Sequence, residues 1–262
     1  MTNAALHVAR TGLDAQNERM RVIANNPANV NTTGFKRDRA SFETLAYQAI
    51  TAPGASSSAE NKYATGLSLG SGVQINGTTR METQGTLATT GSGYDMAIEG
   101  AGYFQIQMPD GRTGYTRDGN FVPSAEGKLV TSDGKPLIPE ITIPEGATSL
   151  TIGADGTVSA TLAGQAEATE LGRVEIARFT NPAGLENTGN NILMETAASG
   201  TPQVGPGGAD GRGTIRQGSL EGSNVNVVEE LVDMIETQRA YEIASKMIKA
   251  TDEMLKYVNQ QL

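Results

Sequence analysis

The chain has 262 residues, 37% of them hydrophobic, which is enough to form one large or two ordinary cores. It contains no cysteine and a single histidine, so disulfides, thiolate catalysis and complete His/Cys metal sites are excluded. The formal net charge of −9 repels phosphate backbones, and Lys and Arg do not cluster, so nucleic acid is not expected as a partner.

The first predicted element is an amphipathic helix from Ala4 to Asn26, a stretch made mostly of good helix formers. Its apolar side chains recur every three or four residues: Leu6, Ala9, Leu13, Met20 and Ile23. Pro27 disfavours helical geometry at Asn26, and an asparagine-rich run leads from there to Gly34. Because a proline inside a helix costs about 3 kcal/mol or more, we expect the helix to stop by Asn26 or to bend sharply there.

The middle of the chain predicts an antiparallel β domain. Five Asp-Gly dipeptides, which are typical of tight turns, occur at 110–111, 118–119, 133–134, 155–156 and 210–211. Short strand-like segments lie between several of them: Tyr103 to Met108, Leu150 to Ile152, Thr157 to Leu162 and Arg173 to Phe179. Two stretches rich in small residues, Ala52 to Gly72 and Thr196 to Gly213, are expected to connect this domain to the terminal segments.

The last predicted element is a longer amphipathic helix, which begins at the capping pattern of Asn226 and Glu229. One apolar stripe repeats every seven residues: Val227, Met234, Tyr241, Ile248 and Leu255. A second, adjoining stripe contains Ile243, Met247, Ala250, Met254 and Val258. From Val227 to Gln261 this helix would reach roughly 50 Å at about 1.5 Å per residue, so its neighbours must be extended too.

The predicted fold class is therefore α+β. The N- and C-terminal helices pair as a coiled-coil-like domain, and extended β-type connectors join them to a central antiparallel β domain. Residues 1–30 and 226–262 form the terminal helical polymerisation domain. Residues 31–85 and 200–225 form the connector region, which includes the segment 47–72, and residues 86–199 form the outer β domain.

The two apolar stripes exceed what one molecule can cover. A closed helical hairpin is the alternative interpretation of the stripes, but it buries one face of each helix and leaves apolar surface on the longer one. Other copies of the chain could cover that surface. Contacts between nonidentical patches that do not close a ring propagate as a helical filament, so the pattern favours polymerisation.

No catalytic, cofactor-binding or metal site is predicted. His7 has no second histidine or thiol beside it, and the paired glycines at 70 and 72 and at 100 and 102 lack the rest of a nucleotide loop. The Asp-Gly turns lack the closing glutamate of calcium loops. Two alternatives stay open: an envelope polysaccharide hydrolase, which would need a cleft with converging carboxylates, and an extracellular adhesin, which would give the stripes no role.

Both ends of the chain carry longer motifs. Near the N-terminus these are Ala24-Asn25-Asn26, Ala28-Asn29-Val30 and Thr33-Gly34-Phe35-Lys36. Near the C-terminus they are Ser223-Asn224-Val225-Asn226, Glu229-Glu230-Leu231-Val232, Met234-Ile235 and Gln238-Arg239-Ala240-Tyr241-Glu242. They resemble, in the correct order, the two signatures of the flagellar rod and hook family. Pro27 departs from that family's pattern, which usually has an apolar residue such as Leu there.

The resemblance implies a structural subunit, not an enzyme, in a rigid hollow helical shaft that transmits torque from motor to hook. The chain length, the segment Tyr47 to Gly72 and the stretch Tyr115 to Gly119 favour a subunit of the distal rod, with a proximal rod or hook subunit as the alternative. In such a rod the terminal helices form the inner tube, the β domain faces outward, and the segment Tyr47 to Gly72 adds stiffening contacts.

The implied partners are other copies of the chain, proximal rod and hook subunits, the surrounding ring proteins, the rod-assembly cap and the flagellar type III export apparatus. No apolar run approaches the roughly 18 to 20 residues that span a bilayer, and the N-terminus lacks the features of a secretory signal. We therefore expect no membrane insertion, export without a cleavable signal to a rod that crosses the periplasm, and terminal segments that become ordered on assembly.

The expected subunit interface combines apolar helix positions with matched motif positions. Gly34 is expected to supply a turn conformation, and Phe35 to anchor that turn by burial. The interface residues are Leu6, Leu13, Met20, Ile23, Asn25, Asn26, Asn29, Gly34, Phe35, Lys36, Val227, Leu231, Met234, Gln238, Ala240, Tyr241, Ile248 and Leu255.

Overall fold

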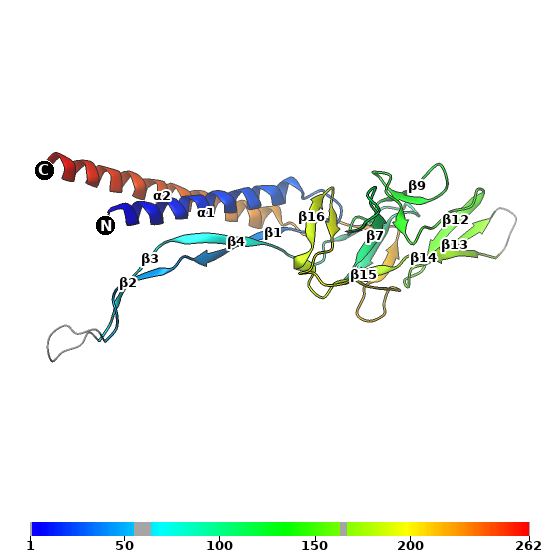
Figure 1. The fold of residues 1–262 in the computed structure, drawn as a ribbon. Helices are drawn as coiled ribbons and strands as arrows, with labels where there is room; N and C mark the ends of the chain where they lie inside the picture. Colours follow the sequence, from blue (N-terminus) through cyan, green and yellow to red (C-terminus); the bar gives the residue numbers. More distant parts are fainter. Residues whose placement is uncertain (1, 55–63, 163–166, 262) are drawn as a thin grey trace. The chain divides into compact units, whose positions relative to one another are not determined.

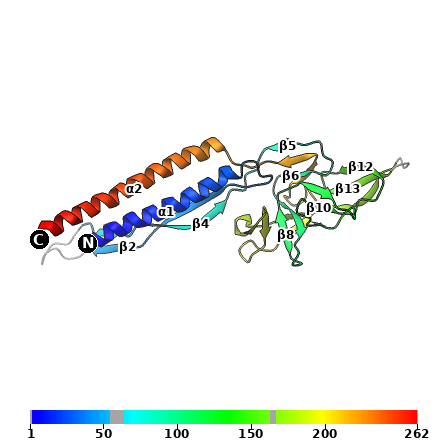
Figure 2. The ribbon, with the colours of Figure 1, turned by 90° about the horizontal axis from the view of Figure 1, so that it is seen from above.

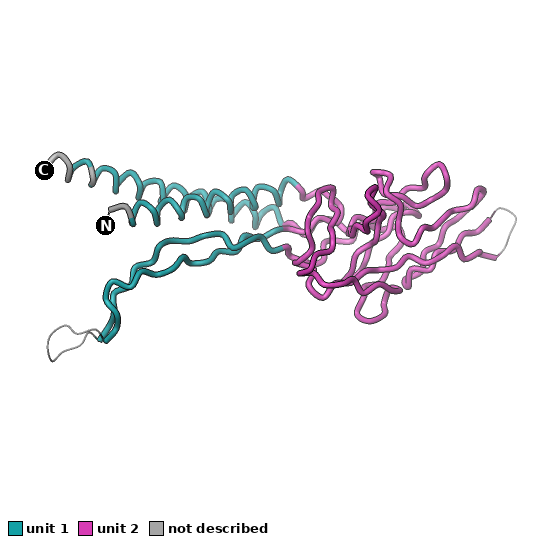
Figure 3. Tube along the Cα trace, in the orientation of Figure 1, with its two compact units in different colours: residues 1–28, 38–79, 226–262 teal, residues 29–37, 80–225 magenta. Residues whose placement is uncertain are grey.

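The computed structural model describes residues 2–54, 64–162 and 167–261, and the chain divides into two compact units. The helical unit comprises residues 1–28, 38–79 and 226–262, and the β unit comprises residues 29–37 and 80–225 (Figure 3). Each unit is built from segments that are far apart in sequence, so the chain passes repeatedly from one unit to the other.

The helical unit contains both long helices, α1 (Thr2–Ala28) and α2 (Val227–Gln261), which pack against each other (Figures 1 and 2). Strand β1 (Asp38–Thr44) packs on α1 and pairs with β4 (Val73–Arg80). Strand β2 (Tyr47–Thr51) pairs antiparallel with β3 (Leu67–Gly70). The predicted pairing of the terminal helices is confirmed, and no helix of the described chain is long and apolar enough to cross a membrane.

The start of α2 is fixed by the predicted capping residue, Asn226. Its side-chain Oδ1 accepts a hydrogen bond from the backbone N–H of Val228 at 3.1 Å, and its carbonyl oxygen accepts one from Glu230 at 3.0 Å. Glu229 and Glu230 place acidic groups in the first turn, at the positive end of the helix dipole.

The predicted stop of α1 by Asn26 is wrong, because the helix continues through Pro27 to Ala28. Only one helical residue follows Pro27. The proline therefore removes a backbone hydrogen bond only at the end of the helix, where no further turn of helix follows that it could kink. Asn26 is held in the helix by its side chain, which exchanges two hydrogen bonds with the backbone of Asp38 at 3.0 and 3.1 Å.

The β unit is built of antiparallel sheets. The largest has the strand order β16–β17–β8–β7–β15–β18, with β11 also paired to β7. Its strands are β7 (Tyr103–Gln107), β8 (Thr113–Thr116), β11 (Leu137–Ile138), β15 (Ile176–Arg178), β16 (Glu186–Gly189), β17 (Ile192–Met194) and β18 (Gln203–Gly205). A second sheet has the order β12 (Ala147–Ile152), β13 (Thr157–Leu162) and β14 (Thr169–Arg173).

Three further strand pairs complete this unit, also antiparallel. They are β5 (Leu87–Thr89) with β20 (Ser219–Glu221), β6 (Met96–Glu99) with β19 (Thr214–Gln217), and β9 (Phe121–Pro123) with β10 (Leu129–Thr131). Among the described residues of the β unit, the helical structure is the 3-10 turn η1 (Pro182–Gly184). The expected antiparallel β region is thus confirmed.

Two hydrophobic clusters form the core of the β unit. The larger contains Phe104 and Phe121, whose rings meet edge to face with centroids 5.4 Å apart. The smaller contains Tyr103, Tyr115 and Phe179, and the last two rings meet edge to face at 4.7 Å. Aromatic pairs of this geometry add stability beyond the area that they bury.

The predicted strand Thr157 to Leu162 is confirmed as β13, but the predicted single strand from Arg173 to Phe179 is wrong. It is divided between β14 and β15, which belong to different sheets. Between them the N–H of Val174 bonds the carbonyl of Gly156, at 2.8 Å, so the chain leaves one sheet and joins the other at this point. Around the crossing Val174 and Ile176 are buried on either side of the half-buried Glu175, so the local pattern does not reveal the change of sheet.

Four of the five Asp-Gly dipeptides place glycine in the left-handed region: Gly111, Gly134, Gly156 and Gly211 have φ between 73° and 93°. The fifth, Asp118-Gly119, is no tight turn. Gly119 is required there for a different reason, since a Cβ on it would lie 1.5 Å from the carbonyl oxygen of Met96.

Candidate assembly surface and buried charge cluster

A row of exposed apolar side chains runs along α2. Its members follow one another at helical intervals, and each is between 50% and 69% exposed. We call this row the α2 stripe: Val228, Val232, Ile235, Ile243, Met247, Met254 and Tyr257. A row of exposed apolar side chains along one face of a helix is typical of a contact site.

The face of α2 that packs on α1 carries buried polar groups among its contacts. Asn26 Nδ2 donates to Glu230 Oε2 at 3.0 Å, and both residues are buried. Arg19 Nη2 lies 3.8 Å from Asp233 Oδ1, and Thr237, which shares this face, is buried. These buried polar contacts, which we call the polar seam, lie on a face of α2 that the exposed α2 stripe does not share.

The predicted interface residues of the helices fall into different environments. Val227, Leu231, Gln238 and Tyr241 are exposed, Met234, Ala240 and Ile248 are half-buried, and the side chain of Leu255 lies outside the described residues. On α1, Leu6, Leu13 and Met20 are half-buried, Ile23 is buried and Asn25 is exposed. The second apolar stripe of the sequence matches the α2 stripe at Ile243, Met247 and Met254.

The other members of the α2 stripe, Val228, Val232, Ile235 and Tyr257, were not among the predicted positions. The signal was present in the spacing, because steps of three and four residues lead from Met247 to each of them. The strict seven-residue repeat predicted a different set of residues. Of these, Val227 and Tyr241 are exposed, while Met234 and Ile248 are half-buried.

Residues of the N-terminal motif are fixed inside the β unit. Gly34 has φ 67°, and its N–H donates to the carbonyl of Glu221 at 2.7 Å. A Cβ at Gly34 would lie 2.6 Å from the carbonyl carbon of Arg117. The turn conformation expected of Gly34 is thus confirmed, while Phe35 and Asn29 are only half-buried.

Lys36 belongs to a buried charge cluster with Arg117 and Glu221. Lys36 Nζ lies 2.5 Å from Glu221 Oε1, and Arg117 Nη1 lies 3.1 Å from Glu221 Oε2. Gly85 N–H also donates to Glu221 Oε1, at 3.0 Å, and Lys36 Nζ donates to the carbonyl of Thr83 at 2.8 Å. Every charge in this cluster is therefore paired and hydrogen-bonded, as buried charges must be.

The two terminal motifs meet at this cluster. Asn224 Oδ1 accepts from the N–H of Arg37 at 2.7 Å, and Asn224 Nδ2 donates to the carbonyl of Met81 at 2.8 Å. Residues 34–37 and 221–224 are thus bound to each other and to the start of the 81–85 segment. The cluster accounts for the residue types at Gly34, Lys36 and Asn224 within a single chain, and their contacts with other subunits stay a prediction.

Burial dominates the electrostatics around the cluster. Desolvation lowers the pKa of Lys36 below its usual range, against the opposing effect of Glu221. Burial, followed by the charge of Glu82 and the hydrogen bond to it, raises the pKa of Tyr103 well above that of a free tyrosine. Burial also raises the pKa of Tyr115 to about 12.

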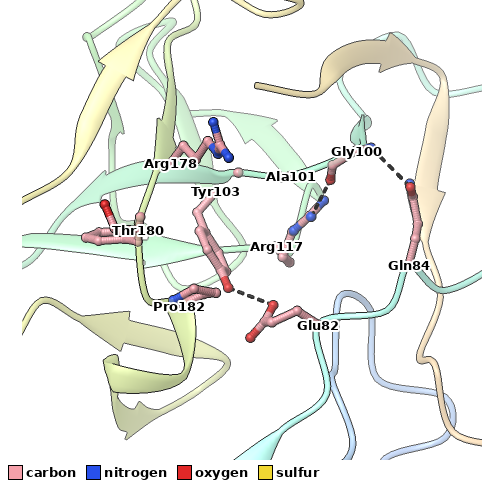
Figure 4. Close-up of a pocket in the computed structure, with 11 residues that line it drawn as sticks. Glu82, Gln84, Gly100, Ala101, Tyr103, Arg117, Arg178, Thr180 and Pro182 are labelled. Carbon is pink, nitrogen blue, oxygen red and sulfur yellow. Dashed lines mark hydrogen bonds between the residues drawn. The ribbon is translucent and has the colours of Figure 1, made fainter. Parts of the chain in front are cut away.

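A hollow lies beside the cluster, lined by residues that include Glu82, Tyr103 and Arg117 (Figure 4). Among its lining residues Glu82 is the one carboxylate, and its Oε2 accepts a hydrogen bond from the Tyr103 hydroxyl at 2.7 Å. Hydrolysis of a glycosidic bond needs two converging carboxyl groups, so this hollow lacks the machinery of the hydrolase alternative. In the described part of the chain no group of His, Asp or Glu is arranged to hold a metal ion.

Paired terminal helices with a spare apolar stripe, joined to a β unit, define a structural protein that assembles with other subunits. Three family descriptions match the chain: Flagella basal body rod protein over residues 6–36, Flagellar hook protein FlgE/F/G D1 domain over 97–160, and Flagellar basal body rod FlgEFG protein C-terminal over 216–261.

Curated relatives match over nearly the full length. The flagellar basal-body rod protein FlgG of Buchnera aphidicola subsp. Acyrthosiphon pisum is 49% identical over 98% of each chain. Those of Agrobacterium fabrum and Borreliella burgdorferi are 46% and 45% identical, over 98% and 97% of this chain and 99% and 97% of theirs. The chain belongs to the FlgG family of flagellar basal-body rod proteins, which is a structural and not an enzymatic family.

Proposed function

We propose that this structural subunit of the flagellar distal rod polymerises by burying its α2 stripe against neighbouring copies. The observation that carries the proposal is the position of the stripe: apolar residues at least half exposed, on a helix whose other face is already bound by a polar seam. Completing the burial of one such half-exposed side chain contributes about 1 to 2 kcal/mol, so the stripe as a whole can offset the entropy lost on assembly.

The test places a charge on the stripe. Met247→Glu would bury an unpaired carboxylate in the proposed contact, and we expect it to abolish assembly of the concentrated protein. Lys249→Gln changes the net charge by the same amount at an exposed position of α2 outside the stripe, and should assemble like the unaltered chain. Sedimentation velocity and electron microscopy measure the outcome. Assembly of Met247→Glu, or equal loss in both variants, would contradict the proposal.

The predicted interface extends beyond the stripe. We propose contacts between subunits for Val227, Leu231, Gln238 and Tyr241, because their side chains are exposed on α2. The half-buried Met234, Ala240 and Ile248 lie nearer the seam, so a contact there would reach only their outer atoms. Cysteine cross-linking from position 238 in assembled rods would test the assignment, and the native chain has no cysteine to interfere.

We also propose that the segment 47–72 stiffens the rod. Its described strands, β2 and β3, expose the apolar side chains of Tyr47, Ile50, Leu67 and Leu69, and residues 55–63 lie outside the described part. Deleting residues 52–70 should give filaments that bend more readily. An unchanged bending stiffness by electron microscopy would count against this role.

The rod family implies assembly with other axial subunits. Among the specific partners, we propose proximal rod and hook subunits at the two ends of the polymer, the surrounding ring proteins, the rod-assembly cap, and the type III apparatus for export. Exposed apolar helices would favour premature polymerisation, so export before ordering of the ends is consistent with the α2 stripe.

A further inference from the structure

Two methionines of the α2 stripe are the most exposed methionines in the described part of the chain. Met247 is 58% exposed and Met254 is 63% exposed. They lie seven residues apart, which is about two helical turns, so both side chains project from the same face of α2. Met96 and Met194, in the β unit, are 0% and 5% exposed. The half-buried methionines are Met20, Met81, Met108 and Met234. A small solute therefore reaches Met247 and Met254 first.

The thioether sulfur of an exposed methionine reacts with peroxides. One oxygen atom passes from the peroxide to the sulfur as the O–O bond breaks and an S=O bond forms. The sulfur loses two electrons, hydrogen peroxide is reduced to water, and no proton is released overall. The product, methionine sulfoxide, is polar and carries a hydrogen-bond acceptor where the side chain was apolar.

The surroundings of Met247 offer no hydrogen bond to such an acceptor. On a helix surface, the neighbours of a side chain are three and four residues away. For Met247 these neighbours are Ile243, Ala244, Ala250 and Thr251. The Thr251 hydroxyl already donates to the carbonyl of Met247, at 2.8 Å. A sulfoxide oxygen at this position would therefore depend on water for its hydrogen bonds, and it would lose them when the stripe is buried.

We propose that Met247 and Met254 form a peroxide-sensitive modification site that blocks assembly of the free subunit. The assembly step rests on the proposed function, because it requires burial of the α2 stripe between copies. The order in which the methionines oxidise depends only on their exposure in a single chain, so it is judged separately. Once a rod has formed, neighbouring copies would shield the same two sulfurs, so the site acts before assembly and not after it.

The test treats the unassembled full chain with hydrogen peroxide. Mass spectrometry of its peptides should show sulfoxide at Met247 and Met254 before it appears at Met96 or Met194. At that point, the concentration needed for assembly, measured by sedimentation velocity, should have risen at least about tenfold, because unsatisfied acceptors enter the contact. The two methionine sulfoxide reductases, one for each epimer, should then restore assembly. Oxidation in the reverse order, or no recovery after complete reduction, would overturn the proposal.

A double variant identifies the thioethers responsible. Met247→Leu with Met254→Leu keeps apolar groups of similar volume on the stripe, so it should still assemble after the same treatment. Met81→Leu with Met108→Leu removes the same number of thioethers outside α2 and should lose assembly as the unaltered chain does. Equal sensitivity of both double variants would assign the effect to other residues and refute the site.

The outcome for the unaltered chain also separates this site from the proposed function. If the chain assembles normally with sulfoxide at both positions while Met247→Glu does not assemble, the modification site fails and the role of the α2 stripe stands. If Met247→Glu assembles as well, both fail.

Discussion

Gly34 and Lys36 stand two residues apart in the N-terminal motif, and both are fixed by the chain around Arg117 and Glu221. Gly34 is needed for its backbone, since a left-handed φ and a carbonyl group in close contact both exclude a side chain. Lys36 is needed for its charge, which pairs with Glu221 where neither side chain is more than 3% exposed. The two motif positions thus require their residue types for different physical reasons, a steric one at Gly34 and an electrostatic one at Lys36.

Replacing Gly34 separates these backbone effects. Gly34→Ala would force a Cβ to within 2.6 Å of the Arg117 backbone, which cannot move as a side chain tip can. Gly111→Ala provides the control, because Gly111 has a similar φ of 83° but open space around its Cβ position. The control should lose only the cost of left-handed geometry, about 1 kcal/mol, and Gly34→Ala clearly more. Urea unfolding of both variants measures the difference, and equal losses would refute the steric argument.

Removing the Lys36 charge leaves Glu221 paired with Arg117 alone. We expect Lys36→Met to lower the free energy of unfolding by roughly 3 kcal/mol, the lower end of the range for breaking a buried pair, because Arg117 and the Gly85 N–H still bind Glu221. The exposed pair of Lys128 with Glu140, 2.8 Å apart, supplies the comparison. Lys128→Met should unfold at the same urea concentration as the unaltered chain. A stable Lys36→Met would show that the cluster adds no net stability.

At the scale of elements, the end of α1 depends on Asn26 more than on Pro27. Asn26→Ala removes three hydrogen bonds, two to the backbone of Asp38 and one to the buried Glu230, at a cost of roughly 1 to 3 kcal/mol. Assembled material should lose its helical circular dichroism at a lower temperature. Pro27→Ala restores an N–H in the last turn and should not lower that temperature. The opposite ranking of the two variants would mean that the proline sets the helix end.

Elements with a local cause could be predicted from the sequence. The capping pattern at Asn226 fixed the start of α2, and four of the Asp-Gly turns have the positive φ of their glycine. Features with a distant cause could not. The continuation of α1 past Asn26 depends on Asp38, and the division of Arg173 to Phe179 between two sheets depends on Gly156. Arg117 and Glu221 look like ordinary surface charges until the fold buries them together.

At the scale of the whole molecule, the two units have different means of holding themselves together. The β unit has two hydrophobic clusters with fully buried aromatic and aliphatic side chains. Among the described residues of the helical unit, the buried apolar side chains are Ala15 and Ile23; the polar seam adds contacts between α1 and α2, and the α2 stripe is left exposed. Since apolar burial is the main stabilising term, the helical unit should be the less stable of the two in a single chain.

Hydrogen exchange of the backbone amides tests this difference. In the monomer we expect the α2 amides around Met247 to exchange much faster than those of β7, because a long helix with few buried apolar contacts opens readily. In assembled rods neighbouring copies would cover the α2 stripe, and linkage to assembly should slow exchange in α2 while β7 changes little. Met247→Glu should keep the fast exchange at any concentration. Equal protection of α2 and β7 in the monomer would mean that α2 is already stably folded in a single chain. Burial of the α2 stripe would then not be needed to order the helix on assembly.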